Sequence, residues 1–540
     1  MPKVIKPILV LLNLIILATS VSAQVDTAWV RRYNGPGNGD DYPKALAADD
    51  SGNVYVTGFG LGAGLTNDYV TIKYKPNGDT AWVRFYNGSG NSGDTAWAIA
   101  VDDSGNVYVT GSGYTTTANG SGSDYSTIKY APNGDIVWQR YYNSSPTANR
   151  NDYAYAQAVD DSGNVYVSGA SAGLGTNLDY ATIKYAGDGT ARWSKRYNGP
   201  GSDFDAVYAL AVDDSGNVYV TGQSVGSGTG DDYATIKYAP NGDTVWLRRY
   251  NGPGNSTDIA YALAVDDNGN VLVTGHSFGS GTSDDYATIK YAPNGDTLWV
   301  RRYNGVSNGQ DWAFDLAIDS AGNVCVTGFS WDGTSKQDYA TIKYDPDGST
   351  LWERRYNGPG NYYDFAFALA VDGSGNVYVT GIGAANVSNT DYTTIKYSPE
   401  GDSLWTRSYK GPGDNSDEAY AVAIDNAGNV YVTGNSYGSG TGFDYATIKY
   451  TQCFAKPGDA NASGTYTLGD AIAIVNYIFN KPGCVPLPTC WLSGLLCRGD
   501  WNGTGTVTLG DAIRAVNYVF NKPGGPWDAL PIGVCCLAGP

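Results

Sequence analysis

The chain is poor in the residue types from which many catalytic and nucleic-acid sites are built. Its 540 residues include one histidine and one methionine, and 34 lysines and arginines stand against 53 aspartates and glutamates. A single histidine excludes a metal site made of several imidazoles. The formal net charge of -19 leaves no basic surface for a phosphate backbone, so we expect no nucleic-acid partner.

Long apolar runs are absent after the first residues of the chain. The N-terminus, MPKVIKPILVLLNLIILATSVSAQ, has two lysines before an apolar stretch and small residues at its end, which is typical of a secretory signal peptide. We expect residues 1–23 to be removed, with a retained N-terminal anchor as the alternative. The mature chain is then predicted to be secreted or extracellular, either free or attached to a cell surface, without a membrane span.

Cysteines are scarce over most of the sequence. Six of the seven lie between Cys453 and Cys536, where an exported chain can oxidise them. A clasp from Cys453 to Cys535 or Cys536 is one arrangement to consider, and the sequence does not determine the connectivity. Cys325 stands alone at a place where other repeats have tyrosine, as at Tyr55, so we expect a small core residue.

Glycine, tyrosine and repetition are abundant. The chain contains 72 glycines and 44 tyrosines, and the motif SGNVYVTG recurs along it. Its asparagine returns every 53 residues, except in the second step, which is 58 residues. A fixed period of this size is typical of solenoids, propellers and arrays. The repeated asparagines are Asn53, Asn106, Asn164, Asn217, Asn270, Asn323, Asn376 and Asn429.

Each repeat predicts a four-stranded sheet. The fourth copy has four runs rich in β-branched and aromatic residues, separated by turn residues such as Asp213–Asn217 and Pro240–Asp243. In its third run, DYATIKY, alternation places packable side chains on both faces, as a sheet between two neighbouring sheets requires. The sequence therefore favours radial blades over a stacked β-helix.

The two ends of the repeat region predict a closed ring. Residues 26–35, DTAWVRRYNG, match only a fourth strand, and the last copy ends near Tyr450 without one. Together they complete one sheet, whereas a linear array would leave two bare edges. We therefore predict an all-β fold, an eight-bladed β-propeller closed by the N-terminal strand, over residues 24–451. Its AVDDSGNVYVTG units resemble the bacterial SBBP-type β-propeller repeats, and this resemblance implies the fold but no single activity.

The loops predict which face of the ring differs between blades. Connections within a blade alternate between a face with short, nearly identical turns, here the uniform face, and a face with dissimilar loops, here the variable face. We expect binding on the variable face, where Trp97, Trp312, Trp331, Tyr114 and His276 lie in or beside loop segments. Scattered exposed aromatics without a ligand are the alternative. His276 itself is interpreted as a neutral loop residue.

The regularly spaced tryptophans and lysines are predicted to be structural. One tryptophan per repeat, from Trp29 to Trp405, and the lysine of each TIKY segment occupy the same place in every copy. Identical spacing in each blade indicates packing between blades. Most carboxylates recur with the turns, so no pair for glycoside hydrolysis is identified. We therefore expect no catalytic residue. The expected cofactor is calcium, bound by the C-terminal segment.

The C-terminal segment carries a different, duplicated motif. GDANASGTYTLGDAIAIVNYIFNKPG and GDWNGTGTVTLGDAIRAVNYVFNKPG each begin with the oxygen-donor spacing of an EF-hand-type loop and continue as an amphipathic helix. Converging hard oxygens from a short loop are what calcium requires. The predicted ligands are Asp459, Asn461, Ser463, Thr465 and Asp470 in the first loop, and Asp500, Asn502, Thr504, Thr506 and Asp511 in the second.

The two copies resemble type I dockerins. This resemblance implies a small α-helical module of paired EF-hand-type loop-helix units, at residues 459–526, that docks to a cohesin-like scaffold protein. Residues 452–458 are the expected linker and residues 527–540 a cysteine-containing tail. Ser463 and Thr504 stand where dockerins usually have aspartate, which leaves two carboxylates in each loop for calcium.

These features predict a secreted, non-catalytic binding protein. Its propeller would bind a glycan or a protein through the variable face, and its dockerin-like module would dock to a cohesin-like partner with calcium. Two alternatives are open. One is an extracellular polysaccharide-degrading glycosidase or lyase on a propeller scaffold, and the other is a structural cell-surface protein.

Overall fold

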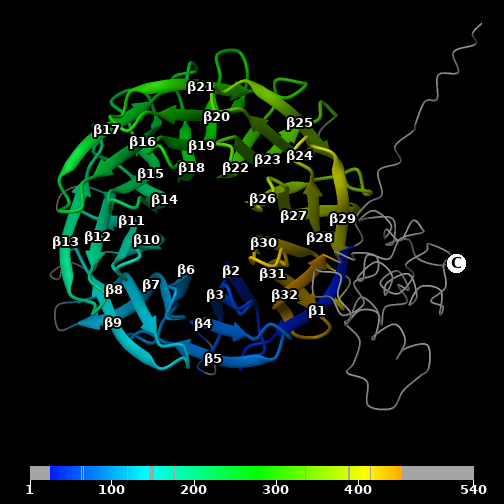
Figure 1. Cartoon of the computed structure of the whole chain (residues 1–540). Coiled ribbons are helices and arrows are strands. Elements are labelled where there is room, and N and C mark those ends of the chain that lie inside the picture. Colours follow the sequence, from blue (N-terminus) through cyan, green and yellow to red (C-terminus); the bar gives the residue numbers. More distant parts are fainter. Residues whose placement is uncertain are drawn as a thin grey trace, which may run out of the picture. The chain divides into compact units, whose positions relative to one another are not determined.

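The computed structural model describes residues 25–452, apart from residues 63, 65, 118–119, 145–150, 174–176, 335, 387–388 and 414. This part of the chain contains 32 strands in eight four-stranded sheets. The sheets surround one axis, and their innermost strands are β2, β6, β10, β14, β18, β22, β26 and β30 (Figure 1). The predicted eight-bladed β-propeller is confirmed. The predicted signal peptide and dockerin-like module lie outside the described residues.

The first seven blades each follow the chain without interruption. Their strands are β2 (Asp41–Ala48), β3 (Val54–Leu61), β4 (Asn67–Tyr74) and β5 (Thr80–Tyr86) in blade 1; β6 (Thr95–Val101), β7 (Val107–Thr117), β8 (Gly120–Tyr130) and β9 (Ile136–Tyr142) in blade 2; β10 (Asp152–Val159), β11 (Val165–Ala172), β12 (Leu178–Tyr185) and β13 (Ala191–Tyr197) in blade 3; β14 (Asp205–Val212), β15 (Val218–Val225), β16 (Asp231–Tyr238) and β17 (Thr244–Tyr250) in blade 4; β18 (Asp258–Val265), β19 (Val271–Phe278), β20 (Asp284–Tyr291) and β21 (Thr297–Tyr303) in blade 5; β22 (Asp311–Ile318), β23 (Val324–Trp331), β24 (Gln337–Tyr344) and β25 (Thr350–Tyr356) in blade 6; β26 (Phe365–Val371), β27 (Val377–Asn386), β28 (Asn389–Tyr397) and β29 (Ser403–Tyr409) in blade 7.

Blade 8 combines strands from both ends of the repeat region, as the strand count predicts. Its order is β1-β32-β31-β30. The N-terminal β1 is therefore the outer strand, and both sheet edges that a linear array would expose are removed. The strands are β30 (Asp417–Ile424), β31 (Val430–Gly438), β32 (Gly442–Gln452) and β1 (Val25–Tyr33).

The recurring Asp-Asp-Ser-Gly-Asn segment is a capped hairpin turn. In blade 4 the Asp213 carboxylate accepts hydrogen bonds from the backbone N–H groups of Ser215 and Asn217, at 3.0 and 2.8 Å. It also accepts one from the Tyr219 hydroxyl at 2.8 Å. Gly216 has a φ of 77°, which other residues adopt only at a cost. The motif is repeated because each blade needs the same turn.

Both faces of each blade are buried against neighbouring blades. Ala234, Ile236 and Tyr238 of β16 pack with residues of blade 3, whereas Tyr233 on the opposite face packs with Ala260 of blade 5. Burying a large apolar side chain contributes about 1.5–3 kcal/mol. The core is therefore a set of layers between neighbouring blades. The third strand of blade 4 contributes to two of these layers, one on each of its faces.

The regularly spaced tryptophans and lysines join adjacent blades, as predicted. Trp246 is 5% exposed, and its indole N–H donates to the Pro293 carbonyl of the next blade at 3.0 Å. The Lys237 ammonium donates to the same carbonyl at 3.3 Å and lies 5.0 Å from the Tyr219 ring centroid. Cys325 is fully buried within such a layer. Its prediction as a small core residue is also confirmed.

Candidate binding surface around the ring axis

A β-bulge in each innermost strand singles out one residue per blade. In blade 4 the register between β14 and β15 shifts between Val207 and Ala209, so Tyr208 is the extra residue. The same shift occurs in every blade. Bulges redirect a side chain away from the regular pleat. The eight bulged residues are Lys44, Trp97, Tyr155, Tyr208, Tyr261, Phe314, Phe367 and Tyr420.

The bulged residues contact one another all the way round the axis, and we call them the axial belt. Neighbouring ring centroids from Trp97 to Tyr420 are 5.6–5.8 Å apart. Lys44 completes the circle, because its ammonium lies 5.2 Å from the Trp97 ring centroid and 5.1 Å from that of Tyr420. All eight side chains are partly buried. The innermost strands thus bring seven aromatic rings and one lysine together around the axis, each with part of its surface open to solvent.

Blades 5 to 7 extend the axial belt towards the variable face. The His276 ring stacks on Trp312 with centroids 4.3 Å apart and an interplanar angle of 12°. Trp312 lies 5.6 Å from Phe329, and Phe329 lies 4.8 Å from Phe365. The Trp312 indole N–H donates to the Asp284 carboxylate at 3.0 Å. We call His276, Trp312, Phe329 and Phe365 the aromatic cluster.

The interpretation of His276 as a loop residue is wrong. It lies within β19, pairs with Ile259 and Tyr286, and is 3% exposed. Burial lowers the pKa of His276 to about 4, against the attraction of the Asp284 carboxylate. Its Nδ1 atom is buried without a hydrogen-bond partner. The imidazole is therefore neutral at physiological pH, and β19 extends further than the loop pattern indicated.

Two of the predicted variable-face aromatics, Tyr114 and Trp331, pack against loop backbone and not against the axial belt or the aromatic cluster. Tyr114 and Trp331 lie in second strands, at the position that contacts the connection from the preceding blade into their own. A side chain at Gly309 would collide with the Trp331 ring, and one at Gly90 with the Tyr114 ring. Trp97 and Trp312 do reach the axis. Of the five aromatic residues expected on the variable face, the structure thus brings only some together at the axial belt and the aromatic cluster.

The sequence pattern could have revealed the axial belt. Seven of the eight repeats have an aromatic residue three positions after the aspartate that opens the first run, as in Asp205 and Tyr208, and the exception is Lys44. Strict alternation would turn that position into a blade face. The bulge turns this position towards the axis instead, so the recurring aromatic residue, and not the alternation, is the usable signal.

Comparison with known proteins agrees with this architecture. A family model described as a β-propeller repeat, SBBP, matches residues 28–65, 192–228, 245–281 and 411–440. The chain is an eight-bladed β-propeller repeat protein. The propeller is also similar to the uncharacterized WD repeat-containing protein L264 of Acanthamoeba polyphaga mimivirus, with 25% identity over 432 residues. These cover 67% of this chain and 26% of that relative, so the chain spans about a quarter of the relative's length.

Similar solved structures include proteins of several kinds. They are a PL25 ulvan lyase bound to an oligosaccharide (TM-score 0.40, 13% identity, 78% of this chain and 95% of that one), the WD40 domain of SCAP from fission yeast (TM-score 0.40, 10% identity, 79% and 97%), and Drosophila plexin A in complex with semaphorin 1b (TM-score 0.37, 10% identity, 79% and 87%). Likenesses of this size leave the function of the propeller open.

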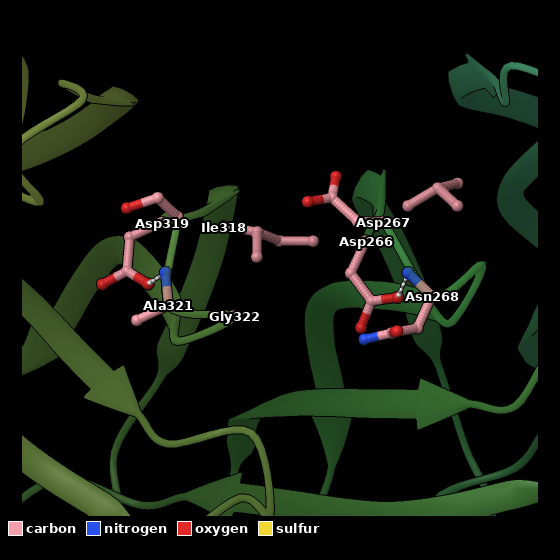
Figure 2. A pocket seen from close by; sticks show the side chains of 9 residues that line it. Asp266, Asp267, Asn268, Ile318, Asp319, Ala321 and Gly322 are labelled. Carbon is pink, nitrogen blue, oxygen red and sulfur yellow. Dashed lines mark hydrogen bonds between the residues drawn. The ribbon is translucent and has the colours of Figure 1, made fainter.

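The uniform face of the propeller contains shallow grooves between neighbouring turns. Figure 2 shows one of about 320 Å³ between Asp266 of blade 5 and Asp319 of blade 6. Each of these carboxylates accepts a backbone N–H two residues on, from Asn268 at 3.1 Å and from Ala321 at 2.9 Å. Asp267 is exposed beside them. Two further grooves between such turns have volumes of about 430 and 280 Å³, so the grooves follow from the repeated turn.

The part of the chain that the structure describes contains neither a cluster of metal ligands nor a membrane-spanning helix. Within residues 25–452, apart from the gaps, no three histidine, cysteine, aspartate or glutamate side chains are arranged to hold a metal ion. In the same residues, no helix is long and apolar enough to span a membrane. The ten predicted calcium ligands and the six C-terminal cysteines lie outside this part of the chain.

Proposed function

We propose that the propeller is a non-catalytic interaction protein that binds a glycan or a protein at the variable-face end of its axis. The observation that carries the proposal is the axial belt together with the aromatic cluster. The rings of the axial belt, Trp312 and Phe365 keep part of their surface open to solvent, whereas His276 and Phe329 are buried. Apolar surfaces with a few placed polar groups are typical of binding sites. The similarity to a WD repeat-containing protein supports an interaction role.

The second part of the proposal concerns attachment. The chain is exported by its signal peptide, and its dockerin-like module docks to a cohesin-like scaffold when Asp459 and Asp500 and the other loop oxygens hold calcium. The doubled motif in the sequence supports this assignment. The propeller then serves as the binding part of a larger extracellular assembly.

The binding surface is tested with the full mature chain and two sets of variants. Arrays of polysaccharides and of extracellular proteins identify a ligand, and Trp312→Ala combined with Phe365→Ala should weaken its binding at least tenfold. Leu351→Ala is the control, because Leu351 is a 51% exposed apolar residue of an outer strand. Equal binding by both variants would contradict the site. Cleavage of a polysaccharide, abolished by one carboxylate substitution, would contradict the non-catalytic assignment.

Attachment is tested by calcium and by capture on a cohesin-like protein. The full mature chain should bind the cohesin-like protein in calcium and dissociate in excess chelator. Asp459→Ala combined with Asp500→Ala should abolish capture, since each loop then keeps one carboxylate. Asp267→Ala is the matched control on the propeller. Capture that persists in chelator would show that the loops do not act through calcium.

A further inference from the structure

The axial belt has one position that is not aromatic. Lys44 occupies it, and four rings surround its ammonium, with centroids 5.1 to 5.7 Å away at Tyr420, Trp97, Phe59 and Tyr42. Burial lowers the pKa of Lys44. The break in the belt therefore places a cationic hydrogen-bond donor among aromatic faces, where blades 8 and 1 meet.

Two further polar side chains lie beside this break. Glu418 of β30 is paired with Asn435 of β31, and its carboxylate accepts a hydrogen bond from the Tyr420 hydroxyl. Glu418 also attracts the Lys44 ammonium. Asn435 is 1% exposed, yet neither its amide nitrogen nor its amide oxygen has a hydrogen-bond partner. An unmade buried bond costs about 1–3 kcal/mol, so a bound group, directly or through water, would complete this amide.

The fold does not require polar residues at these places. Blade 1 has Tyr42 and Phe59 where blade 8 has Glu418 and Asn435, and blade 7 has Phe365 and Ile382. Polar side chains also stand at the position of Asn435 in three other blades, at Ser112, Gln223 and His276. The position of Glu418 carries a charged residue in blade 8 alone, so only blade 8 combines a carboxylate with an amide at this pair of positions.

The donors and acceptors at this junction match one class of ligand. Lys44 donates, Glu418 accepts, and the Asn435 amide does both. An apolar peptide side chain would leave these groups desolvated without partners. The opposite charges of Lys44 and Glu418 balance, and the net charge of -19 opposes a polyanion. A neutral pyranose ring offers adjacent hydroxyls that donate and accept, and an apolar C–H face for an aromatic ring.

We infer that Lys44, Glu418 and Asn435, with the rings of Trp97 and Tyr420, form a subsite for a neutral sugar ring at the junction of blades 8 and 1. The inference rests on the proposed glycan-binding function and names the class of sugar. It also places the specificity in blades 8 and 1, with the Trp97 ring contributed by blade 2, whereas the aromatic cluster lies across blades 5 to 7.

Calorimetric titration of the full mature chain tests the subsite. The probes are cellohexaose, xylohexaose, mannohexaose and chitohexaose as neutral sugars, and hexagalacturonate as the anionic comparison. At least one neutral hexasaccharide should bind, and hexagalacturonate should bind at least tenfold more weakly. Asn435→Leu and Lys44→Met should each weaken binding of the neutral sugar at least tenfold. Asn435→Leu should not lower the melting temperature, because it removes an unpartnered buried amide.

The matched control is Gln223→Leu, at the position of blade 4 that corresponds to Asn435. Gln223 accepts a hydrogen bond from Tyr208 at 2.9 Å, and its replacement should change sugar affinity less than twofold. The inference is overturned if no neutral hexasaccharide binds, if both blade 8 and blade 1 variants bind normally, or if hexagalacturonate binds more tightly. In each of these cases the proposed binding function is judged separately, by the array experiment. It is still supported if the ligand found on the arrays no longer binds to the variant with Trp312→Ala and Phe365→Ala.

Discussion

The guanidinium of Arg32 contacts the carboxylate of Asp444 at 2.8 Å, although 412 residues of sequence separate them. Arg249 and Asp232 make the same pair at 2.7 Å within the continuous blade 4. Blades 3, 5 and 6 contain the same pair. The ends of the repeat region therefore rebuild an ordinary blade, and the ring closes with a contact that blades 3 to 6 also use.

Deletion of residues 24–35 should lower the melting temperature of the whole propeller. It removes β1, bares the edge of β32, and takes Trp29 away from the rings of Tyr74 and Tyr431. Scanning calorimetry measures the change. Arg249→Met provides the comparison, since it breaks one equivalent pair in blade 4, leaves the Asp232 carboxylate without this donor and should cost about 1–3 kcal/mol. A deletion that melts no earlier than this variant would refute closure by β1.

Trp246→Phe should destabilise the propeller by about 1–3 kcal/mol, because it removes buried volume and the hydrogen bond to the Pro293 carbonyl of blade 5. Denaturant unfolding with a fixed slope gives the free energy. Val245→Ala is the control on the same strand, because Val245 is 52% exposed, and it should have little effect. Equal losses for both substitutions would rule out the tryptophan as an inter-blade link.

The propeller should be more stable at pH 4.5 than at pH 7. Burial raises the pKa of Asp41, Asp94, Asp258 and Asp364 to about 6, above the value of about 3.9 for an unfolded aspartate. The folded state therefore binds more protons between these values, and stability falls as pH rises through 6. The pKa of the Asp213 carboxyl is lowered in the folded state. Its protonation therefore reduces stability only below about pH 4, outside the range compared here.

Chemical unfolding at several pH values measures this dependence. Asp258→Asn should flatten the change between pH 4.5 and 7, because the amide does not titrate. It also loses one of the two acceptors for the N–H groups of Gly252 and Phe278, which affects all pH values equally. Stability that rises steadily from pH 4.5 to 7 would contradict the pKa directions of these four carboxyls.

His276 should make the propeller less stable at low pH, which is the opposite of the effect of the four carboxyls. Its folded pKa of about 4 lies below the unfolded value of about 6.5, so the unfolded state binds more protons and stability is lost as pH falls from about 6.5 to 4. His276→Phe should gain stability relative to the wild type over this range. Phe329→His, at the equivalent position of blade 6, should show the reverse. No pH dependence in either difference would mean that His276 is not buried as a neutral ring.

Several residues show why most of the fold follows from the sequence. The segment DTAWVRRYNG identifies β1 as a fourth strand because its pattern is local and recurs in every copy. The turn at Asp213 depends on neighbours four to six residues away, so it too can be read from the motif. The fixed position of Trp246 indicates a common packing role. Local rules, repeated eight times, leave few alternatives to a ring of blades.

Much less of the candidate site than of the fold can be predicted from the sequence. Trp97 and Trp312 were expected near a ligand, but the axial belt depends on a bulge that alternation does not show. His276 was assigned to a loop because the end of β19 is decided by pairing with β18 and β20. The importance of Asn435 emerges only from its burial and unpartnered amide.

The sequence by itself determined the repeated blade, the number of blades and the closing strand, because periodicity, turn residues and strand alternation are local properties that add up along the chain. Only the tertiary structure decided which side chains meet at the axis. Lys44 and Tyr420 lie in different blades at opposite ends of the repeat region, and a contact of this kind exists only once the ring is closed and each bulge has turned its residue out of the blade.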